Sequence, residues 1–240
     1  MDRAALITGG SSGIGLAIAR ALGEDGYRLT VSARRPDKLE AAAQGLRDDG
    51  FDVEAVPANM ADEEEIRKLV AAHRERCGRL DVLVNNAGIG IGGAVADAET
   101  KKLDLQLNVN LRAVYLLARE TIPMLKEAGA EHGKALMANT ASIAGKHGQG
   151  WLAAYSATKF GVVGLSQALH KELAGDGVQV TAICPGFVAT AMTDWVEGQV
   201  PKDEMIQPED IAEAIRFLLR TSRNCVVPEI QFVRPADSEL

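Results

Sequence analysis

Short apolar segments alternate with longer amphipathic segments along the whole chain, and this alternation limits the possible folds more than any other feature. Most of these short segments are rich in apolar residues and do not alternate strictly between apolar and polar positions, as a half-exposed strand would. Strands of this kind have both faces covered, which is typical of a parallel sheet with helices on either side. We expect seven strands, at residues Ala4–Thr8, Arg28–Ala33, Val53–Pro57, Val82–Val84, Ala135–Thr140, Val178–Ile183 and Val226–Val233.

The segments between the strands repeat apolar residues at intervals of three and four, which predicts amphipathic helices. Asp62 can cap a helix that begins with three glutamates, and Pro208 suits the first turn of another. The two longest helices are expected at about Thr100–Glu127 and Leu152–Ala174. With right-handed crossovers these elements form one domain over residues 1–240. It is an α/β, doubly wound Rossmann fold, with a seven-stranded parallel sheet and helices on both faces.

A glycine-rich segment joins the first predicted strand to the first predicted helix. Its glycines permit a tight turn and a close backbone approach to a pyrophosphate, and the helix N-terminus offers unpaired N–H groups. The spacing Gly-x-x-x-Gly-x-Gly differs from the general Gly-x-Gly-x-x-Gly form, so a glycine-rich turn that binds nothing is the alternative. The strand before it and the amphipathic helix after it favour dinucleotide binding. The residues predicted to contact the dinucleotide here are Gly9, Ser11, Ser12, Gly13, Ile14 and Gly15.

The segment Thr30–Arg35, which includes the end of the second strand, carries no carboxylate. In an NAD site, an acidic residue at this point would bind the adenosine ribose. Here Arg34 and Arg35 end the strand instead, and arginine suits a 2′-phosphate through charge-assisted, often bidentate hydrogen bonds. We therefore predict that NADP(H) is preferred over NAD(H). The alternative is a solvated arginine pair at a strand end.

Tyr155 and Lys159 stand one helical turn apart on the apolar face of the second long helix, which directs both side chains toward the sheet. A phenol with an ordinary pKa of about 10 is a poor base at neutral pH, and a neighbouring ammonium lowers that pKa. Ser142, just after the fifth strand, can bind a substrate carbonyl, and Asn110 lies inside a helix without a capping role. Tyr-x-x-x-Lys alone is a common accident of helix surfaces. Its coincidence with the other motifs favours a catalytic set.

Jointly, the motifs of this chain resemble those of the short-chain dehydrogenase/reductase family, including its 3-oxoacyl carrier-protein reductases. The likeness covers essentially the whole chain and rests on Thr8-Gly-x-x-x-Gly-x-Gly15, Asn85-Asn-Ala-Gly88, Asn110, Ser142, Tyr155-x-x-x-Lys159 and Pro185-Gly186. The resemblance implies that Tyr155 is the general acid in reduction and the general base in oxidation. It implies that Lys159 lowers the pKa of Tyr155 and binds the nicotinamide ribose, and that Ser142 orients the carbonyl.

The resemblance also implies further site residues. Asn110 would hold a water that links Lys159 to solvent. The additional cofactor contacts that the family likeness implies are Asn59, Met60, Asn86, Ala87, Gly88, Pro185, Gly186, Val188 and Thr190.

The chain departs from the family pattern in two places. Asn59 stands where the family usually has an acidic residue beside the adenine. The C-terminal segment from Cys225 to Leu240 lacks the family's frequent glycine-rich ending, which often joins an oligomer interface. The resemblance implies a homodimer or homotetramer formed through the two long helices, and this ending makes the tetramer the less favoured of the two.

The net charge of −7 gives no electrostatic reason to expect nucleic acid or an anionic membrane as a partner. No segment is long and apolar enough to predict a membrane span or a secretory signal, so we expect a cytoplasmic protein. The three cysteines and four histidines lack metal-site spacing, and no metal is predicted. Trp151, Met192 and Trp195 flank the expected mouth of the site. They could line the pocket or take part in core or dimer packing, and the sequence does not favour either role.

The sequence thus predicts an NADP(H)-dependent short-chain oxidoreductase that interconverts a carbonyl and an alcohol. The expected partner is a small-molecule substrate, with a 3-oxoacyl thioester or a small ketone as candidates. The alternatives are an NAD-dependent alcohol dehydrogenase of the same fold and a dinucleotide-binding regulator without turnover.

Overall fold

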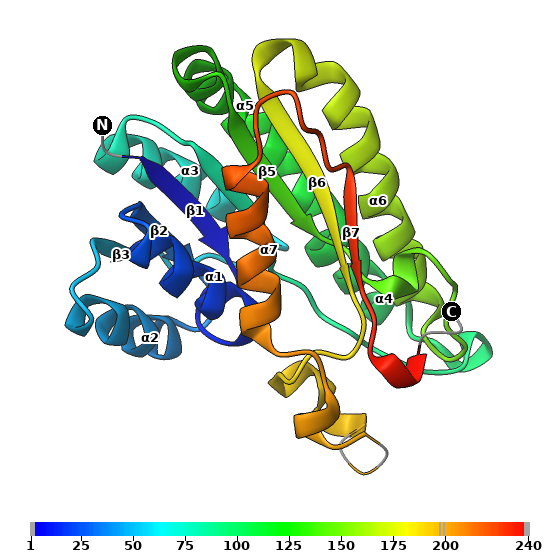
Figure 1. The fold of residues 1–240 in the computed structure, drawn as a ribbon. Coiled ribbons are helices and arrows are strands. Elements are labelled where there is room, and N and C mark those ends of the chain that lie inside the picture. Colours follow the sequence, from blue (N-terminus) through cyan, green and yellow to red (C-terminus); the bar gives the residue numbers. More distant parts are fainter. Residues whose placement is uncertain (1–2, 197, 199, 238–240) are drawn as a thin grey trace.

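The seven predicted strands form one parallel sheet (Figure 1). The computed structural model describes residues 3–196, 198 and 200–237. The strands are β1 (Ala4–Thr8), β2 (Arg28–Ser32), β3 (Val53–Ala55), β4 (Val82–Asn85), β5 (Ala135–Thr140), β6 (Val178–Pro185) and β7 (Glu229–Phe232). Their order across the sheet is β3-β2-β1-β4-β5-β6-β7, and each neighbouring pair is parallel.

Helices cover both faces of the sheet, because each connection between parallel strands must return along one face (Figure 1). One face carries α1 (Gly13–Glu24), α2 (Pro36–Asp48) and α7 (Pro208–Arg220). The other carries α3 (Glu63–Cys77), α5 (Ala113–His132), which α4 (Thr100–Leu107) precedes, and α6 (Ala153–Leu173). Short 3₁₀ turns lie at Val95–Asp97, Ile143–Gly145, Ala174–Asp176, Ala191–Val196, Lys202–Glu204 and Pro235–Asp237. Among the described residues, no helix has the length and apolar character that crossing a membrane needs.

Successive residues of one strand pack into different halves of the core. Leu6 of β1 belongs to the cluster beneath α3 and α5, and its neighbour Ile7 belongs to the cluster beneath α1 and α7. Both side chains are fully buried. This two-sided burial is what strands without strict apolar–polar alternation predict, and it confirms the doubly wound α/β fold.

The strand order reverses at β1, and this reversal positions the site. Ile7 pairs with Val31 of β2 on one side and with Val84 of β4 on the other. The connections leaving β1 and β4 therefore go to opposite faces, which opens a crevice beyond the carboxyl ends of these strands. In folds of this kind the crevice is where a ligand binds.

The first long helix differs from the prediction for Thr100–Glu127. The helical segment continues to His132, and a π-helical turn at Asn108–Arg112 interrupts it between α4 and α5. The periodicity of apolar residues gives only a weak sign of this turn, because the one extra residue shifts the phase of the pattern by a single position.

The last strand is shorter than the predicted Val226–Val233. Pro228 has no N–H to donate, and β7 begins one residue later, at Glu229, and ends at Phe232. The carbonyl of Pro228 still accepts a hydrogen bond from the backbone N–H of Ala182, at 3.0 Å. The sheet is therefore closed on this side by a four-residue strand.

Candidate active site

The glycine-rich loop is shaped by close backbone contacts that leave no room for side chains. A Cβ atom on Gly9 would lie 2.8 Å from Nδ2 of Asn86, and one on Gly13 would lie 2.8 Å from Cγ2 of Thr190. A Cβ on Gly15 would collide with the carbonyl of Gly9. Gly9 and Gly13 also have φ angles of +68° and +52°, a conformation that favours glycine.

The N-terminus of α1 lacks the usual protein partners of a helix end. Ser12 stands at the N-cap position, but its side chain makes no capping hydrogen bond, and the first turn contains no acidic residue. The helix start therefore keeps unpaired N–H groups and its partial positive charge, which together suit a phosphate group. Among the described residues, the hydroxyls of Ser11 and Ser12 make no hydrogen bond. The loop thus fits a pyrophosphate in both space and charge.

Residues predicted to lie at opposite ends of a dinucleotide converge on this loop. Thr190, which follows β6, packs directly over Gly13. Asn86, which follows β4, donates from Nδ2 to the carbonyl of Thr8 at 3.2 Å and accepts from Thr140 Oγ1 at 3.3 Å. The segments after β1, β4, β5 and β6 therefore meet at one edge of the sheet.

The arginine pair after β2 is exposed at the same edge. Neither Arg34 nor Arg35 makes an ion pair or a side-chain hydrogen bond with any residue that the structure describes, and both are exposed. Arg35 is the N-cap residue of α2. Two solvated guanidinium groups beside the glycine-rich loop are available to a phosphate. No carboxylate of the described residues pairs with either of them.

The predicted adenine contacts have other duties as well. Oδ1 of Asn59 accepts a hydrogen bond from the backbone N–H of Ala61 at 3.1 Å, and its own backbone N–H donates to Glu65 Oε2 at 2.6 Å. Met60 is buried in the core beneath α3. The side chain of Asn59 thus shapes a turn, and that of Met60 packs inward.

Tyr155, Lys159 and Ser142 lie together at the carboxyl end of β5. Lys159 is buried on α6, and its Nζ donates to the carbonyl of Thr140 at 2.7 Å. The same Nζ lies 5.5 Å from the centroid of the Tyr155 ring. Ser142 Oγ accepts from the backbone N–H of Ala144 at 3.1 Å and donates to the carbonyl of Pro185 at 3.3 Å, so it joins the end of β5 to the end of β6.

The pKa values of these groups are shifted mainly by burial. Burial raises the pKa of Tyr155 above its ordinary value, and interaction with the Ser142 side chain opposes this. Burial lowers the pKa of Lys159 to about 8. Desolvation of the Tyr155 ring therefore outweighs the hydrogen bond with Ser142. That Lys159 lowers the pKa of this phenol stays a prediction of the family resemblance.

Asn110 lies in the π-helical turn and binds the loop after β4. Its Oδ1 accepts from the backbone N–H of Ile89 at 2.9 Å, and its Nδ2 donates to the Ile89 carbonyl at 2.9 Å. Nδ2 also donates to Thr158 Oγ1 on α6, at 3.2 Å. A Cβ on Gly88 would lie 3.5 Å from Asn110 Oδ1 and 3.7 Å from Lys159 Nζ. Asn110 therefore holds the backbone beside Lys159 in place.

A second set of buried amides ties the strands beneath the site. Asn85 Nδ2 donates to Asn139 Oδ1 at 2.8 Å, joining β4 to β5. Asn139 Nδ2 donates to Ser166 Oγ at 3.0 Å, which fixes α6 against β5. This chain of hydrogen bonds sets the height of α6 above the sheet, and with it the positions of Tyr155 and Lys159.

Three features of the site were not found by sequence reasoning. The carbonyl of Thr140 binds Lys159, Thr158 binds Asn110, and the π-helical turn orients Asn110. The poor helix propensity of asparagine was the one available signal for the turn. The backbone acceptor at Thr140 left no trace in the sequence, because any residue supplies a carbonyl.

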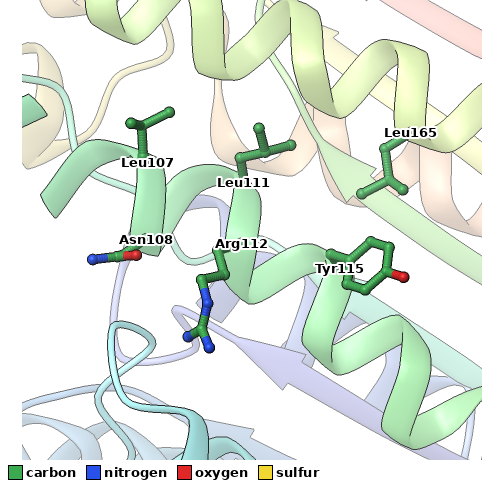
Figure 2. A pocket seen from close by; sticks show the side chains of 6 residues that line it. All are labelled: Leu107, Asn108, Leu111, Arg112, Tyr115 and Leu165. Carbon is green, nitrogen blue, oxygen red and sulfur yellow. The ribbon is translucent and has the colours of Figure 1, made fainter. Parts of the chain in front are cut away.

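An apolar groove lies away from these residues, on the outer face of the long helices (Figure 2). It has a volume of about 430 Å³ and is lined by Leu107, Asn108, Leu111, Arg112, Tyr115 and Leu165. The first five come from α4, the π-helical turn and α5, and the last comes from α6. Tyr115 is 57% exposed.

Among the described residues, no group of three or more His, Cys, Asp or Glu residues could hold a metal ion.

Comparison with known proteins agrees with this geometry. Residues 3–200 match the family model of the short chain dehydrogenases. A Streptomyces coelicolor protein named as a ketoacyl reductase is 40% identical, over 90% of this chain and 89% of its own length. The crystal structure of an actinorhodin polyketide ketoreductase variant with NADPH superposes with a TM-score of 0.87 and 35% identity, over 96% of this chain and 95% of that one. The Brucella melitensis 3-ketoacyl-(acyl-carrier-protein) reductase, complexed with NADH, superposes with a TM-score of 0.86 and 31% identity. This match covers 96% of this chain and 95% of that one.

The fold and the residues at its carboxyl edge define a nucleotide-dependent oxidoreductase with a Rossmann fold. The chain belongs to the short-chain dehydrogenase/reductase family. It is therefore an NAD(P)-dependent enzyme that acts on carbonyl and CH–OH groups of small molecules.

Proposed function

We propose that this chain is an NADP(H)-dependent carbonyl reductase whose catalytic set is Tyr155, Lys159, Ser142 and Asn110. The observation that carries the proposal is the convergence of these residues at the carboxyl end of β5. Lys159 is bound to the Thr140 carbonyl, within 5.5 Å of the Tyr155 ring centroid, and Ser142 follows two residues after Thr140. Residues 1–240 act as one catalytic domain.

The residues of the chain carry out the proton chemistry. When bound, NADPH supplies a hydride to the carbonyl carbon. The Ser142 hydroxyl turns from the Pro185 carbonyl to donate its hydrogen bond to the substrate carbonyl oxygen, and the Tyr155 hydroxyl donates its proton to the same oxygen. Because burial raises the pKa of Tyr155, the phenol is protonated at neutral pH, as the reductive direction requires. The Lys159 ammonium then stabilises the phenolate that remains.

The same edge of the sheet holds the cofactor in this proposal. The glycine-rich loop and the N-terminus of α1 bind the pyrophosphate. Arg34 and Arg35 bind the 2′-phosphate of NADP(H), which explains the absence of a carboxylate after β2. A related ketoreductase crystallised with NADPH supports this preference. The remaining contacts are proposed at Asn59, Met60, Asn86, Ala87, Gly88, Lys159, Pro185, Gly186, Val188 and Thr190.

The proposed substrates are 3-oxoacyl thioesters or small ketones, in line with the relatives that carry the name ketoacyl reductase. The test is a titration of the purified protein with NADPH and NADH, followed by turnover of acetoacetyl thioester and a panel of ketones. We expect tighter binding of NADPH and oxidation of NADPH with at least one of these carbonyls. Binding of neither nucleotide would overturn the proposal, and binding without any turnover would favour a regulator.

We further propose that the chain forms a homodimer through the apolar groove on its long helices. Figure 2 shows Leu107, Leu111 and Tyr115 along one helical segment, with Leu165 on the neighbouring helix. Leu107 is 37% exposed, so this side chain is free to contact a second copy. Sedimentation velocity should give a dimer for the wild type and a monomer for Leu107→Glu. A dimeric Leu107→Glu protein would place the interface elsewhere.

A further inference from the structure

Three aromatic side chains form a row beside the proposed catalytic residues. Trp151 lies just before α6, Trp195 lies in the turn Ala191–Val196, and Phe187 follows Pro185-Gly186. The ring centroids of Trp151 and Trp195 are 6.5 Å apart, and those of Phe187 and Trp195 are also 6.5 Å apart. Both distances are within the range of favourable aromatic pairs. We call these three residues the aromatic row.

The aromatic row is connected to the Tyr155 ring by a loop of glycines. A Cβ on Gly90 would lie 3.9 Å from ring carbons of Tyr155, and a Cβ on Gly92 would lie 2.6 Å from ring carbons of Trp151. The backbone N–H of Gly93 donates to the carbonyl of Trp151 at 2.8 Å. The same strip of backbone therefore touches the phenol that donates the proton and the first ring of the row. A substrate held at Tyr155 has the aromatic row as its neighbour.

The two ends of the aromatic row are held in place. Trp151 has a φ angle of +67°, and it is the one non-glycine residue with a positive φ in the described part of the chain. This conformation is costly for a bulky residue and persists only where surrounding contacts impose it. At the other end, the guanidinium of Arg234 lies 5.5 Å from the Phe187 ring centroid and pairs with Asp237 at 2.8 Å.

The surface of the aromatic row is apolar and open. Trp151 is 63% exposed and Trp195 is 58% exposed, although large aromatic side chains gain most from burial. Among the described residues, two charged side chains near the row in sequence are paired: Asp194 with Lys202 at 2.7 Å, and Lys146 with Glu229 at 2.8 Å. The row therefore presents the faces and edges of rings, with paired charges beside it.

We propose that the aromatic row determines substrate specificity, selecting carbonyl compounds that carry an aromatic ring near the reacting carbonyl. The inference rests on the proposed reductase function and narrows its substrate class. A ring stacked on Trp195 replaces water on a surface already held in place, so binding orders few protein side chains. An aromatic ring also gains the face and edge contacts that a saturated ring of the same size lacks.

The kinetic test uses three ketones with the same reacting group: phenylacetone, cyclohexylacetone and butanone. The wild type should prefer phenylacetone over both others in kcat/KM. Trp195→Leu should lower kcat/KM for phenylacetone about tenfold, mainly through KM, and leave butanone almost unchanged. Phe217→Leu is the matched control, because Phe217 is a 52% exposed aromatic residue on α7, outside the row. An equal loss for phenylacetone and butanone in Trp195→Leu would overturn the inference.

A binding test separates failure of this inference from failure of the proposed function. The chain has two tryptophans, and both belong to the aromatic row, so tryptophan fluorescence reports on this surface alone. The probes are the alcohols 1-phenyl-2-propanol and 1-cyclohexyl-2-propanol, which require no turnover. We expect a saturable change with the phenyl alcohol, weaker binding of the cyclohexyl alcohol, and loss of the preference in Trp195→Leu. A binding preference for the phenyl alcohol in a protein that turns over no ketone would contradict only the reductase function. Ketone turnover by a protein without this binding preference would contradict only the role of the aromatic row.

Discussion

We call the amino and carboxyl ends of the strands the two edges of the sheet, and these edges differ in how completely their polar groups are paired within the protein. At the amino edge, polar groups bind one another: buried Asp81 accepts from the backbone N–H of Ala4 at 2.8 Å and from both ends of the Arg79 guanidinium, at 2.9 and 2.7 Å. His73, also buried, contacts Thr30 Oγ1 at 2.8 Å and the Arg79 carbonyl at 2.9 Å. At the carboxyl edge, the start of α1 makes no side-chain capping bond.

This contrast shows how the presence or absence of a protein partner decides what a polar group does. A polar group that has a protein partner contributes to folding, and one that lacks a partner remains available to a ligand. Two helix N-termini make the same point. Asp62 caps α3 by accepting from the N–H groups of Glu64 and Glu65, at 2.8 and 3.2 Å, whereas α1 begins with neither cap nor carboxylate. Substitutions at the two edges should therefore change different measurements.

The largest effect is expected at the carboxyl edge, from Tyr155→Phe. Removing the proton donor should lower kcat for ketone reduction by about 10²–10⁴-fold. The thermal midpoint and the Kd for NADPH should stay at wild-type values, because the ring and its packing remain. Steady-state NADPH oxidation and a nucleotide titration measure both quantities. Wild-type kcat in this variant would remove Tyr155 from the mechanism.

The next effect belongs to the amino edge and depends on pH. Burial lowers the pKa of His73 from 6.5 to about 4, aided by the charges of Arg76 and Arg28 and opposed by the Arg79 carbonyl and Asp81. As the pH falls, the unfolded chain binds this proton before the folded protein does. The stability that the neutral ring contributes is therefore complete above pH 6.5 and is lost progressively down to about pH 4.

The loss attributable to His73 should total about 3 kcal/mol over this window. Urea unfolding of the wild type and of His73→Gln at pH 7 and at pH 4.5 measures it, because glutamine keeps a polar side chain that does not titrate. The unfolding free energy of His73→Gln should depend less steeply on pH. Parallel curves for the two proteins would show that His73 titrates normally. The kcat of the folded variant at pH 7 should equal that of the wild type.

A smaller effect is expected from the arginine pair. Replacing Arg34 and Arg35 with alanine removes charge-assisted hydrogen bonds to the 2′-phosphate, each of which contributes about 1.5–3 kcal/mol. The Kd for NADPH should rise by about 10-fold or more, and the Kd for NADH should change little. Isothermal titration with both nucleotides measures the ratio. An unchanged ratio of the two Kd values would mean that Arg34 and Arg35 are solvated and do not bind the 2′-phosphate. The free energy of unfolding should stay close to wild type, since neither arginine has a partner among the described residues.

The smallest effects are expected from removing the cap at the start of α3 and from adding a carboxylate at the start of α1. Asp62→Ala removes the cap of α3 and should lower the free energy of unfolding by about 1 kcal/mol, with the Kd for NADPH unchanged. Ser12→Asp places a carboxylate at the start of α1, where it should raise stability by a few tenths to about 1 kcal/mol. The same carboxylate repels a pyrophosphate, so the Kd for NADPH should rise. Tighter NADPH binding in Ser12→Asp would mean that the pyrophosphate lies elsewhere.

The sequence predicted most of the architecture because the relevant signals are local. The apolar strands, the glycines at 9, 13 and 15 and the capping position of Asp62 each reflect the conformation of a few consecutive residues. Arrangements that depend on distant partners could not be predicted. The carbonyl that binds Lys159 belongs to a residue 19 positions away, and Arg234 reaches Phe187 from beyond the last strand. The positive φ of Trp151 was also hidden, because tryptophan does not favour that conformation.

The π-helical turn at Asn108–Arg112 has a consequence for how this chain can change over evolutionary time. Such a turn contains one residue more than a regular helix needs at the same place. Deleting that residue would restore an α-helix but would rotate everything on one side of it by about 100° relative to the other. Asn110 would then point away from Ile89, or Tyr115 would leave the outer face. A change in length here therefore displaces residues on one whole side of the turn, whereas a substitution affects one position.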